Sequence, residues 1–278
     1  MENGDSVNYY FDPTMGDDSY AGTSPEKPFR NFSKIDDLSL KPGDSILLRS
    51  GAVFQDALYI SCSGAPGKQI VLGKYGGNDR PWIKEDASRM QAVHIFNSEH
   101  VVIRDLEISN KGPDPVAGLN GLLVELENYG TAKDITIDSL FVHDVYGSVV
   151  REENDGGHAI LLQNYDFEST DSVPSRFDGQ LVQNCSIRNC QRSGIIMWGN
   201  WERKRWFPSL NVVIRNNLLD GVPGDGIVPV GCESPLVEYN VMKNCPHTLP
   251  PTEACDGIWP WSCDHAIVQY NIVSDHKS

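Results

Sequence analysis

The stretch Asp225-Gly226-Ile227 returns as Asp256-Gly257-Ile258, and an earlier copy reads Ser193-Gly194-Ile195. The copies follow one another at steps of roughly thirty residues, and self-similarity at periods of about 20–50 residues is the signature of a solenoid. After each copy comes a second apolar run that ends in Asn, such as residues 236–240. Because a solenoid stacks equivalent positions of successive coils into columns, the repeat predicts which side chains are neighbours.

Similar apolar runs, bounded by Gly, Pro or Asp, occupy residues 45–49, 57–60 and 69–72, and further apolar runs occupy 101–106, 135–140 and 181–185. Near-continuous aliphatic runs of this length favour parallel strands. Stacked amides hydrogen-bond along a column, so we expect a structural ladder from the strand-ending Asn residues, which are Asn184, Asn217, Asn240 and Asn271.

Residues 29–38 form the one helical pattern near the N-terminus, with an apolar side chain at every third position. A solenoid must close its end against water and against edge-to-edge pairing, and this helix is a candidate cap. We therefore predict one all-β domain over residues 1–278, in which 1–45 are an N-terminal strand and the capping helix and 46–278 are coils. The repeat is still in rhythm at residue 271, so we expect the run of coils to be truncated at the C-terminus.

Composition narrows the function classes. The net charge of −15 argues against nucleic acid and anionic membranes as partners, and no run approaches the roughly 18 apolar residues of a membrane span. The polar, acidic residues 1–5 lack the features of a signal peptide, which fits both a mature secreted protein and a cytosolic one. We expect a monomer.

The chain has seven cysteines, an odd number. Cys232 and Cys263 occupy equivalent positions of successive coils and should lie close together, while Cys245 and Cys255 flank a Pro-rich loop and could bridge it. Free cysteines are also among the most often buried residues, and the absence of Cys/His clusters argues against structural zinc.

The column before each Gly-Ile pair carries the first candidate chemistry. Adjacent coils lie about 4.8 Å apart, so Asp225 and Asp256 should be neighbours with carboxyl groups on the order of 5 Å apart. A pair at that spacing is typical of glycosidases, in which one of the two carboxyl groups keeps its proton near neutral pH. Asn120 and Ser193 share this column, however, and favour a purely structural role in turns.

Asp155 and His158 fall at or beside the same column one coil earlier. Histidine transfers protons near neutral pH, so His158 is a candidate for catalysis, together with Asp155 beside it in the sequence. His143, which follows another strand, is a weaker candidate of the same kind, because a histidine beside a turn is commonly structural.

The segment 198–207 concentrates aromatic and cationic residues in an otherwise acidic chain. Aromatic faces stack on sugar rings and cations pair with carboxylates, so the segment predicts a sugar-binding surface; packing back onto the solenoid and a protein interface are the alternatives. Trp259 and Trp261 alternate with Ile258 and Pro260 and should share the outward face. The candidate substrate-binding residues are Trp198, Trp201, Arg203, Arg205, Trp206, Trp259 and Trp261.

A family resemblance emerges from several stretches. The stretches that carry it are residues 8–13, 21–25 and 41–44, the stretch from Arg49 to Gly76, and residues 256–264. In these stretches the chain resembles pectate-lyase-like right-handed β-helix proteins of polysaccharide-degrading bacteria. The resemblance implies a right-handed parallel β-helix, a secreted or periplasmic location and a polysaccharide or oligosaccharide partner. Members usually continue past this length with further coils. The fold hosts several reactions, so it does not by itself select one.

Three functions follow. The first is a glycoside hydrolase that uses the Asp pair on a plant or algal polysaccharide without a cofactor. The second is a polysaccharide lyase, in which Asp225 and Asp256 hold Ca²⁺ and the base is supplied by one of Arg192, Arg203, Lys204 or Arg205. The third is a carbohydrate-binding β-helix without catalysis.

Overall fold

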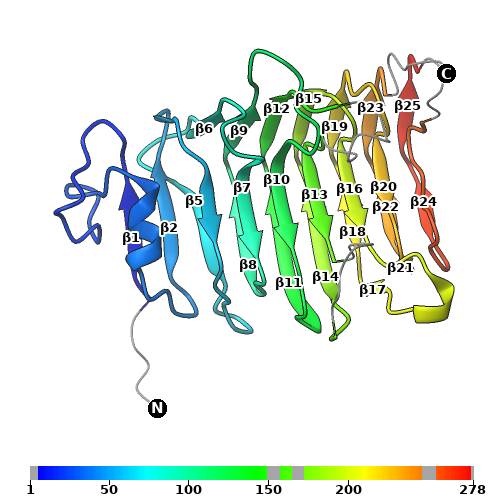
Figure 1. Cartoon of the computed structure of the whole chain (residues 1–278), viewed down its shortest axis with the longest axis horizontal. Helices are drawn as coiled ribbons and strands as arrows, with labels where there is room; N and C mark the ends of the chain where they lie inside the picture. The colour runs from blue at the N-terminus through cyan, green and yellow to red at the C-terminus, as the bar shows by residue number, and fades with distance from the viewer. Residues whose placement is uncertain (1–5, 149–156, 165–171, 246–254, 277–278) are drawn as a thin grey trace.

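The computed structural model describes residues 6–148, 157–164, 172–245 and 255–276. The chain winds into stacked coils whose strands pair in parallel with those of the coils before and after, so that three long sheets run along the molecule (Figure 1). The expected all-β parallel β-helix is confirmed.

The three sheets are named A, B and C, and their described strands follow in order along the helix axis. Sheet A contains β1 (Asn8–Phe11), β2 (Ser45–Arg49), β5 (Ile70–Tyr75), β8 (Val101–Arg104), β11 (Thr131–Asp138), β14 (Arg176–Gln183), β18 (Val213–Arg215), β22 (Leu236–Glu238) and β24 (Ile267–Gln269), with β17 (Ser209–Leu210) and β21 (Cys232–Glu233) beside them. Sheet B contains β3 (Val53–Phe54), β6 (Trp82–Glu85), β9 (Glu107–Asn110), β12 (Phe141–Val145), β15 (Ser186–Cys190), β19 (Leu218–Asp220), β23 (Val241–Lys243) and β25 (Ile272–Ser274). Sheet C contains β4 (Leu58–Ile60), β7 (Gln91–Phe96), β10 (Asn120–Glu125), β13 (Ile160–Gln163), β16 (Ile195–Trp198) and β20 (Ile227–Pro229).

Aliphatic columns fill the interior of the helix. One column on sheet A is in register from coil to coil and consists of Ile46, Leu72, Ile103, Ile137, Val182, Ile214, Val237 and Val268. All of them up to Val237 are at most 1% exposed, whereas Val268 in the last coil is 45% exposed. Burial of such columns is the main favourable contribution to the stability of the fold.

The glycine of the Gly-Ile repeat is required by the close approach of the next coil. A Cβ atom on Gly226 would lie 2.4 Å from the carbonyl oxygen of Gly257, and one on Gly121 would lie 2.6 Å from that of Ala159. Only glycine fits such a contact without moving the backbone, which explains the glycine at these two positions; the equivalent residue of the coil between Gly121 and Gly194 is Ala159.

The predicted capping helix is shorter than its apolar pattern. It is a 3-10 helix, η1, over Phe32–Asp37, at the same end of the solenoid as β1 (Figure 1). Phe32 stacks on Phe54 at a centroid distance of 4.8 Å, and Phe32 and Ile35 are buried. Phe29 joins the adjacent core from an extended segment, bridging Phe11, rather than from the helix.

The amide ladder forms, with one correction. Asn217 Nδ2 donates to Asn240 Oδ1 at 2.9 Å, and Asn240 Nδ2 donates to Asn271 Oδ1 at 2.9 Å. Placing Asn184 in this ladder is wrong, since Cys185 is the residue whose backbone N–H binds Asn217 Oδ1 and Asn184 is exposed. Asn184 has a positive φ of 56°, a turn conformation that Asn tolerates better than most residues, and this explains an Asn there without a ladder.

Replacing Asn240 by alanine is expected to lower the free energy of unfolding by about 1–3 kcal/mol, because it leaves buried backbone groups without partners. Its Oδ1 also accepts the backbone N–H of Asn217, and its Nδ2 donates to the carbonyl of Ile214. Denaturant titration measures the loss, with Asn78→Ala as the matched exposed control, expected to change stability by less than about 0.5 kcal/mol. Equal effects of the two substitutions would contradict the ladder.

All seven cysteines are free thiols, so the possible Cys245–Cys255 bridge is absent. Burial raises the pKa of both Cys185 and Cys190 to about 12, which keeps them protonated and unreactive. Cys232 and Cys263 are neighbours, as expected: a hydrogen bond between them, together with burial, raises the pKa of Cys232, and the same hydrogen bond lowers that of Cys263. In the described part of the chain, no helix has the length and apolar character needed to cross a membrane.

Candidate functional site

The column before the Gly-Ile repeat, called the turn column here, contains Asn120, His158, Ser193, Asp225 and Asp256. The register places Leu122 beside Ile160, Ile160 beside Ile195, and Ile195 beside Ile227, which in turn bridges Ile258. Backbone N–H groups bind the carbonyls of the column, for example Gly194 to Asp225 and Gly226 to Asp256. The predicted adjacency of Asp225 and Asp256 is therefore present.

The two aspartates have different environments. Asp225 is 3% exposed; its Oδ1 accepts the backbone N–H of Asp256 at 2.8 Å, and its Oδ2 lies 3.6 Å from Nη2 of Arg192, which is itself 2% exposed. The guanidinium stabilises the negative charge of Asp225, which a buried position would otherwise disfavour. Asp256 is exposed to solvent. Of the two, Asp256 is the carboxylate that a substrate can reach.

Asn120 repeats the geometry of Asp225 earlier in the column, since its Oδ1 accepts the backbone N–H of His158 at 3.3 Å. A short side-chain oxygen that binds the next coil is thus one structural task of this column. His158 belongs to the column itself and is 5% exposed. Asp155 lies outside the described residues. His143 lies on sheet B, where its two ring nitrogens bind Glu107 and Asp144.

On the outward face of sheet C, an aliphatic row runs beside the turn column. Leu123, Leu161, Ile196 and Val228 are in register, and although they point away from the interior they are at most 6% exposed. Together with Val230 they form a second apolar cluster, separate from the main core. We call this row the outer ridge.

Four indoles, the Trp cluster, pack against the outer ridge. Trp261 stacks on Trp259 at 5.3 Å and on Trp201 at 5.5 Å, and Trp198 lies tilted at 5.6 Å from it. Ile258 packs into the main core, so the expected alternation of this segment is present. The sequence segment 198–207 and the segment after Asp256 therefore meet on one surface.

The rest of the aromatic and basic segment does not join this cluster. Arg203 pairs with Asp264 at 2.8 Å, and its guanidinium lies 3.9 Å from the ring centroid of Trp206. Arg205 belongs to the short 3-10 helix η2 (Arg203–Arg205) and points into solvent, with a side chain that is 80% exposed. Of the seven predicted sugar-binding residues, the structure thus gathers the four indoles.

Sequence reasoning missed a polar group on the outward face of sheet C. Phe96, Glu125, Gln163 and Trp198 occupy equivalent positions of successive strands. The Glu125 carboxylate accepts from His94 Nε2 at 2.9 Å and from Gln163 Nε2 at 3.4 Å. The signal in the sequence is the residue that directly follows each aliphatic run of sheet C, which is Glu125 after Val124 and Gln163 after Leu162.

The described residues contain no group of three or more His, Cys, Asp or Glu side chains arranged to hold a metal ion.

Comparisons with known proteins find similarity to lacto-N-biosidases. No protein-family model matches the chain. A lacto-N-biosidase from Bifidobacterium longum subsp. longum is 25% identical over 309 residues, an alignment that covers 84% of this chain and 19% of that protein.

Crystal structures of a GH136 lacto-N-biosidase from Eubacterium ramulus are also similar. The selenomethionine derivative superposes with a TM-score of 0.85 at 26% identity and the native protein with 0.83 at 26%. They match 98% and 96% of this chain, but only 52% of theirs. The chain therefore spans about half the length of the solved relative and a fifth of the curated one. These similarities support the resemblance to carbohydrate-active β-helix proteins that the sequence shows.

Proposed function

We propose that this chain is the β-helix of a secreted glycoside hydrolase of the lacto-N-biosidase type. The observation that carries the proposal is the match of nearly the whole chain to a GH136 lacto-N-biosidase, at 26% identity and a TM-score of 0.85. The relatives are named for a lacto-N-biose glycan, so we propose an oligosaccharide of that kind as the substrate. The plant or algal polysaccharide expected from the sequence is not supported by these names.

The proposed site is the end of the outer ridge where Asp256 begins the segment that carries Trp259 and Trp261. The indoles supply flat apolar surface for sugar rings, and Asp256 supplies an accessible carboxylate for proton transfer or attack at the glycosidic bond. Asp225 is proposed to position Asp256 through the hydrogen bond to its backbone N–H and to serve as the second charge of the pair. His158 precedes Asp225 by two positions in the turn column and remains a proposed contributor, as does Asp155.

The lyase alternative receives less support from the geometry. A lyase needs an accessible base beside a uronate. Arg192 is buried against Asp225, and Arg203 is engaged by Asp264 and Trp206. Lys204 and Arg205 are exposed, but neither belongs to the Trp cluster.

The test is hydrolysis of a p-nitrophenyl lacto-N-bioside by the purified protein. Release of nitrophenol without added metal supports the proposal. Unsaturated uronate formed from pectate or alginate, detected by its ultraviolet absorbance and lost with EDTA, would replace it by the lyase. Retention on glycan affinity gels without turnover of any substrate would favour a binding protein.

Trp261→Ala is expected to raise KM for the reporter about tenfold with a smaller effect on kcat, since it removes the central ring of the Trp cluster and aromatic contacts are worth about 0.5–1.5 kcal/mol. Steady-state kinetics measures both constants. Trp206→Ala is the matched control, because that ring packs under Arg203 outside the cluster. A similar KM for both variants would exclude the Trp cluster as a substrate platform.

A further inference from the structure

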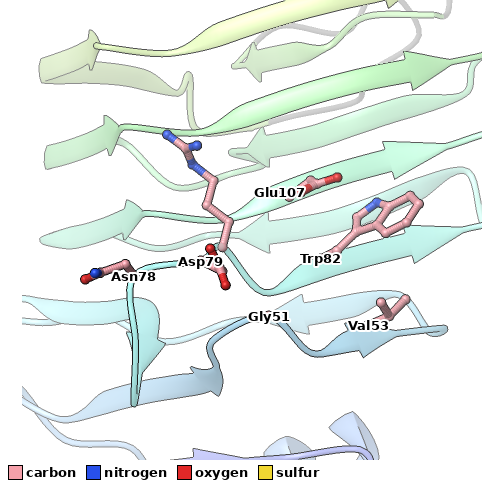
Figure 2. Close-up of a pocket in the computed structure, with 7 residues that line it drawn as sticks. Gly51, Val53, Asn78, Asp79, Trp82 and Glu107 are labelled. Carbon is pink, nitrogen blue, oxygen red and sulfur yellow. The ribbon is translucent and has the colours of Figure 1, made fainter.

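A second surface feature lies on sheet B, on a different sheet from the Trp cluster. It is a hollow of about 510 Å³ lined by Gly51, Val53, Asn78, Asp79, Arg80, Trp82 and Glu107, called the Trp82 pocket here. Figure 2 shows Trp82 and Glu107 on neighbouring strands and Asp79 on the segment that leads into β6. The proposed catalytic surface uses none of these residues.

The floor of the pocket follows from strand register. Val53, Trp82 and Glu107 are aligned on β3, β6 and β9, and the residues after them, Phe54, Ile83 and Ile108, are buried in the core. Alternation along a strand therefore turns Val53, Trp82 and Glu107 outward. Their side chains follow one another at the spacing of the coils, about 4.8 Å.

Trp82 is held in place before any ligand arrives. Its Nε1–H donates to Ser109 Oγ at 3.0 Å, and Lys84 Nζ lies 4.8 Å from the ring centroid. A fixed aromatic wall loses little conformational entropy on binding, which favours a weakly interacting ligand such as a sugar. Sugar-binding proteins use aromatic rings in this way because the C–H groups of a sugar ring pack on an apolar surface.

Two carboxylates, Asp79 and Glu107, line the pocket together with the indole and supply hydrogen-bond acceptors. Glu107 Oε1 is bound by His143 Nε2 at 3.0 Å, but among the described residues neither Glu107 Oε2 nor the Asp79 carboxylate receives a hydrogen bond. The cation of the pocket lining, Arg80, donates its Nε–H to the carbonyl of Ser139. Both carboxylates can therefore accept sugar hydroxyls, and their charge repels uronates and sulfated sugars.

We propose that the Trp82 pocket is an accessory binding site for an uncharged sugar unit. The inference rests on the proposed function only for the class of ligand. A site on sheet B would hold a neutral glycan on the protein while the surface of sheet C acts on the same or another chain, and the link between two sites would raise effective affinity.

The test is hydrogen–deuterium exchange of the purified protein with millimolar lacto-N-biose and with a digalacturonate as the anionic comparator. We expect protection of the segments around 78–82 and 107 by lacto-N-biose alone, with or without EDTA. In Trp82→Ala, and in Asp79→Ala at an exposed position, the sugar concentration that gives half-maximal protection should rise at least tenfold. Tyr239→Ala, at an exposed aromatic that follows β22, should not change it.

Absence of protection at these segments, or unchanged binding in both variants, would overturn the inference even if the reporter glycoside is hydrolysed. Protection by Ca²⁺ alone that EDTA reverses would overturn it in favour of a cation site. Protection by lacto-N-biose without any hydrolysis would support the inference while the proposed function fails.

Discussion

Asp256→Asn is expected to lower kcat for the lacto-N-bioside reporter by about 10²–10⁴-fold, the usual contribution of a positioned acid or base. The substitution removes the charge and the proton transfer but keeps the size of the side chain. The backbone N–H of Asp256 still donates to Asp225, so the local hydrogen bond survives. Since Asp256 is exposed, the stability of the fold should not change.

Asp275→Asn is the matched control for this prediction, as an exposed aspartate of the last described coil away from the Trp cluster. Its kcat and KM should equal those of the wild type, and thermal unfolding of both variants should coincide with it. If Asp256→Asn keeps kcat within about threefold, Asp256 does not take part in the chemistry, and the Glu125 column on sheet C becomes the next carboxylate to test.

Arg192→Met is expected to lower the free energy of unfolding by about 3–5 kcal/mol, because it removes the buried guanidinium that faces the buried carboxylate of Asp225. The two side chains are 2% and 5% exposed, so water cannot take over the role of the guanidinium. The methionine keeps most of the volume of the arginine, which separates the loss of charge from the loss of packing. Equilibrium unfolding in denaturant measures the change.

Two further variants make this prediction specific. Arg192→Met combined with Asp225→Asn should recover part of the lost stability, since it removes the negative charge that faced Arg192 while retaining the Oδ1 acceptor for the Asp256 N–H. Arg188→Met replaces an exposed arginine two residues before the end of β15 and should change stability by less than about 0.5 kcal/mol. A loss below about 1 kcal/mol for Arg192→Met would show that Asp225 is not stabilised by this pair.

The Gly-Ile repeat by itself determined the fold and much of the register between its strands. Ile195, Ile227 and Ile258 align as their spacing predicts, because side chains that alternate into one narrow core leave little freedom to slip by a residue. The same logic fails at Asn184. Gln183 aligns with Arg215, so Asn184 corresponds to Asn216, and Cys185 occupies the ladder position of Asn217.

The sequence also predicted that Asp225 and Asp256 are neighbours and that Trp259 and Trp261 share a face. It could not predict that Arg192 pairs with Asp225, since that contact depends on how one turn folds over the next coil. Nor could it separate Trp201 from Trp206, which lie in one insert but pack against different partners. Periodicity fixes the backbone columns of a solenoid, whereas loop packing and burial, which decide what each carboxylate and indole can do, are set only by the tertiary structure.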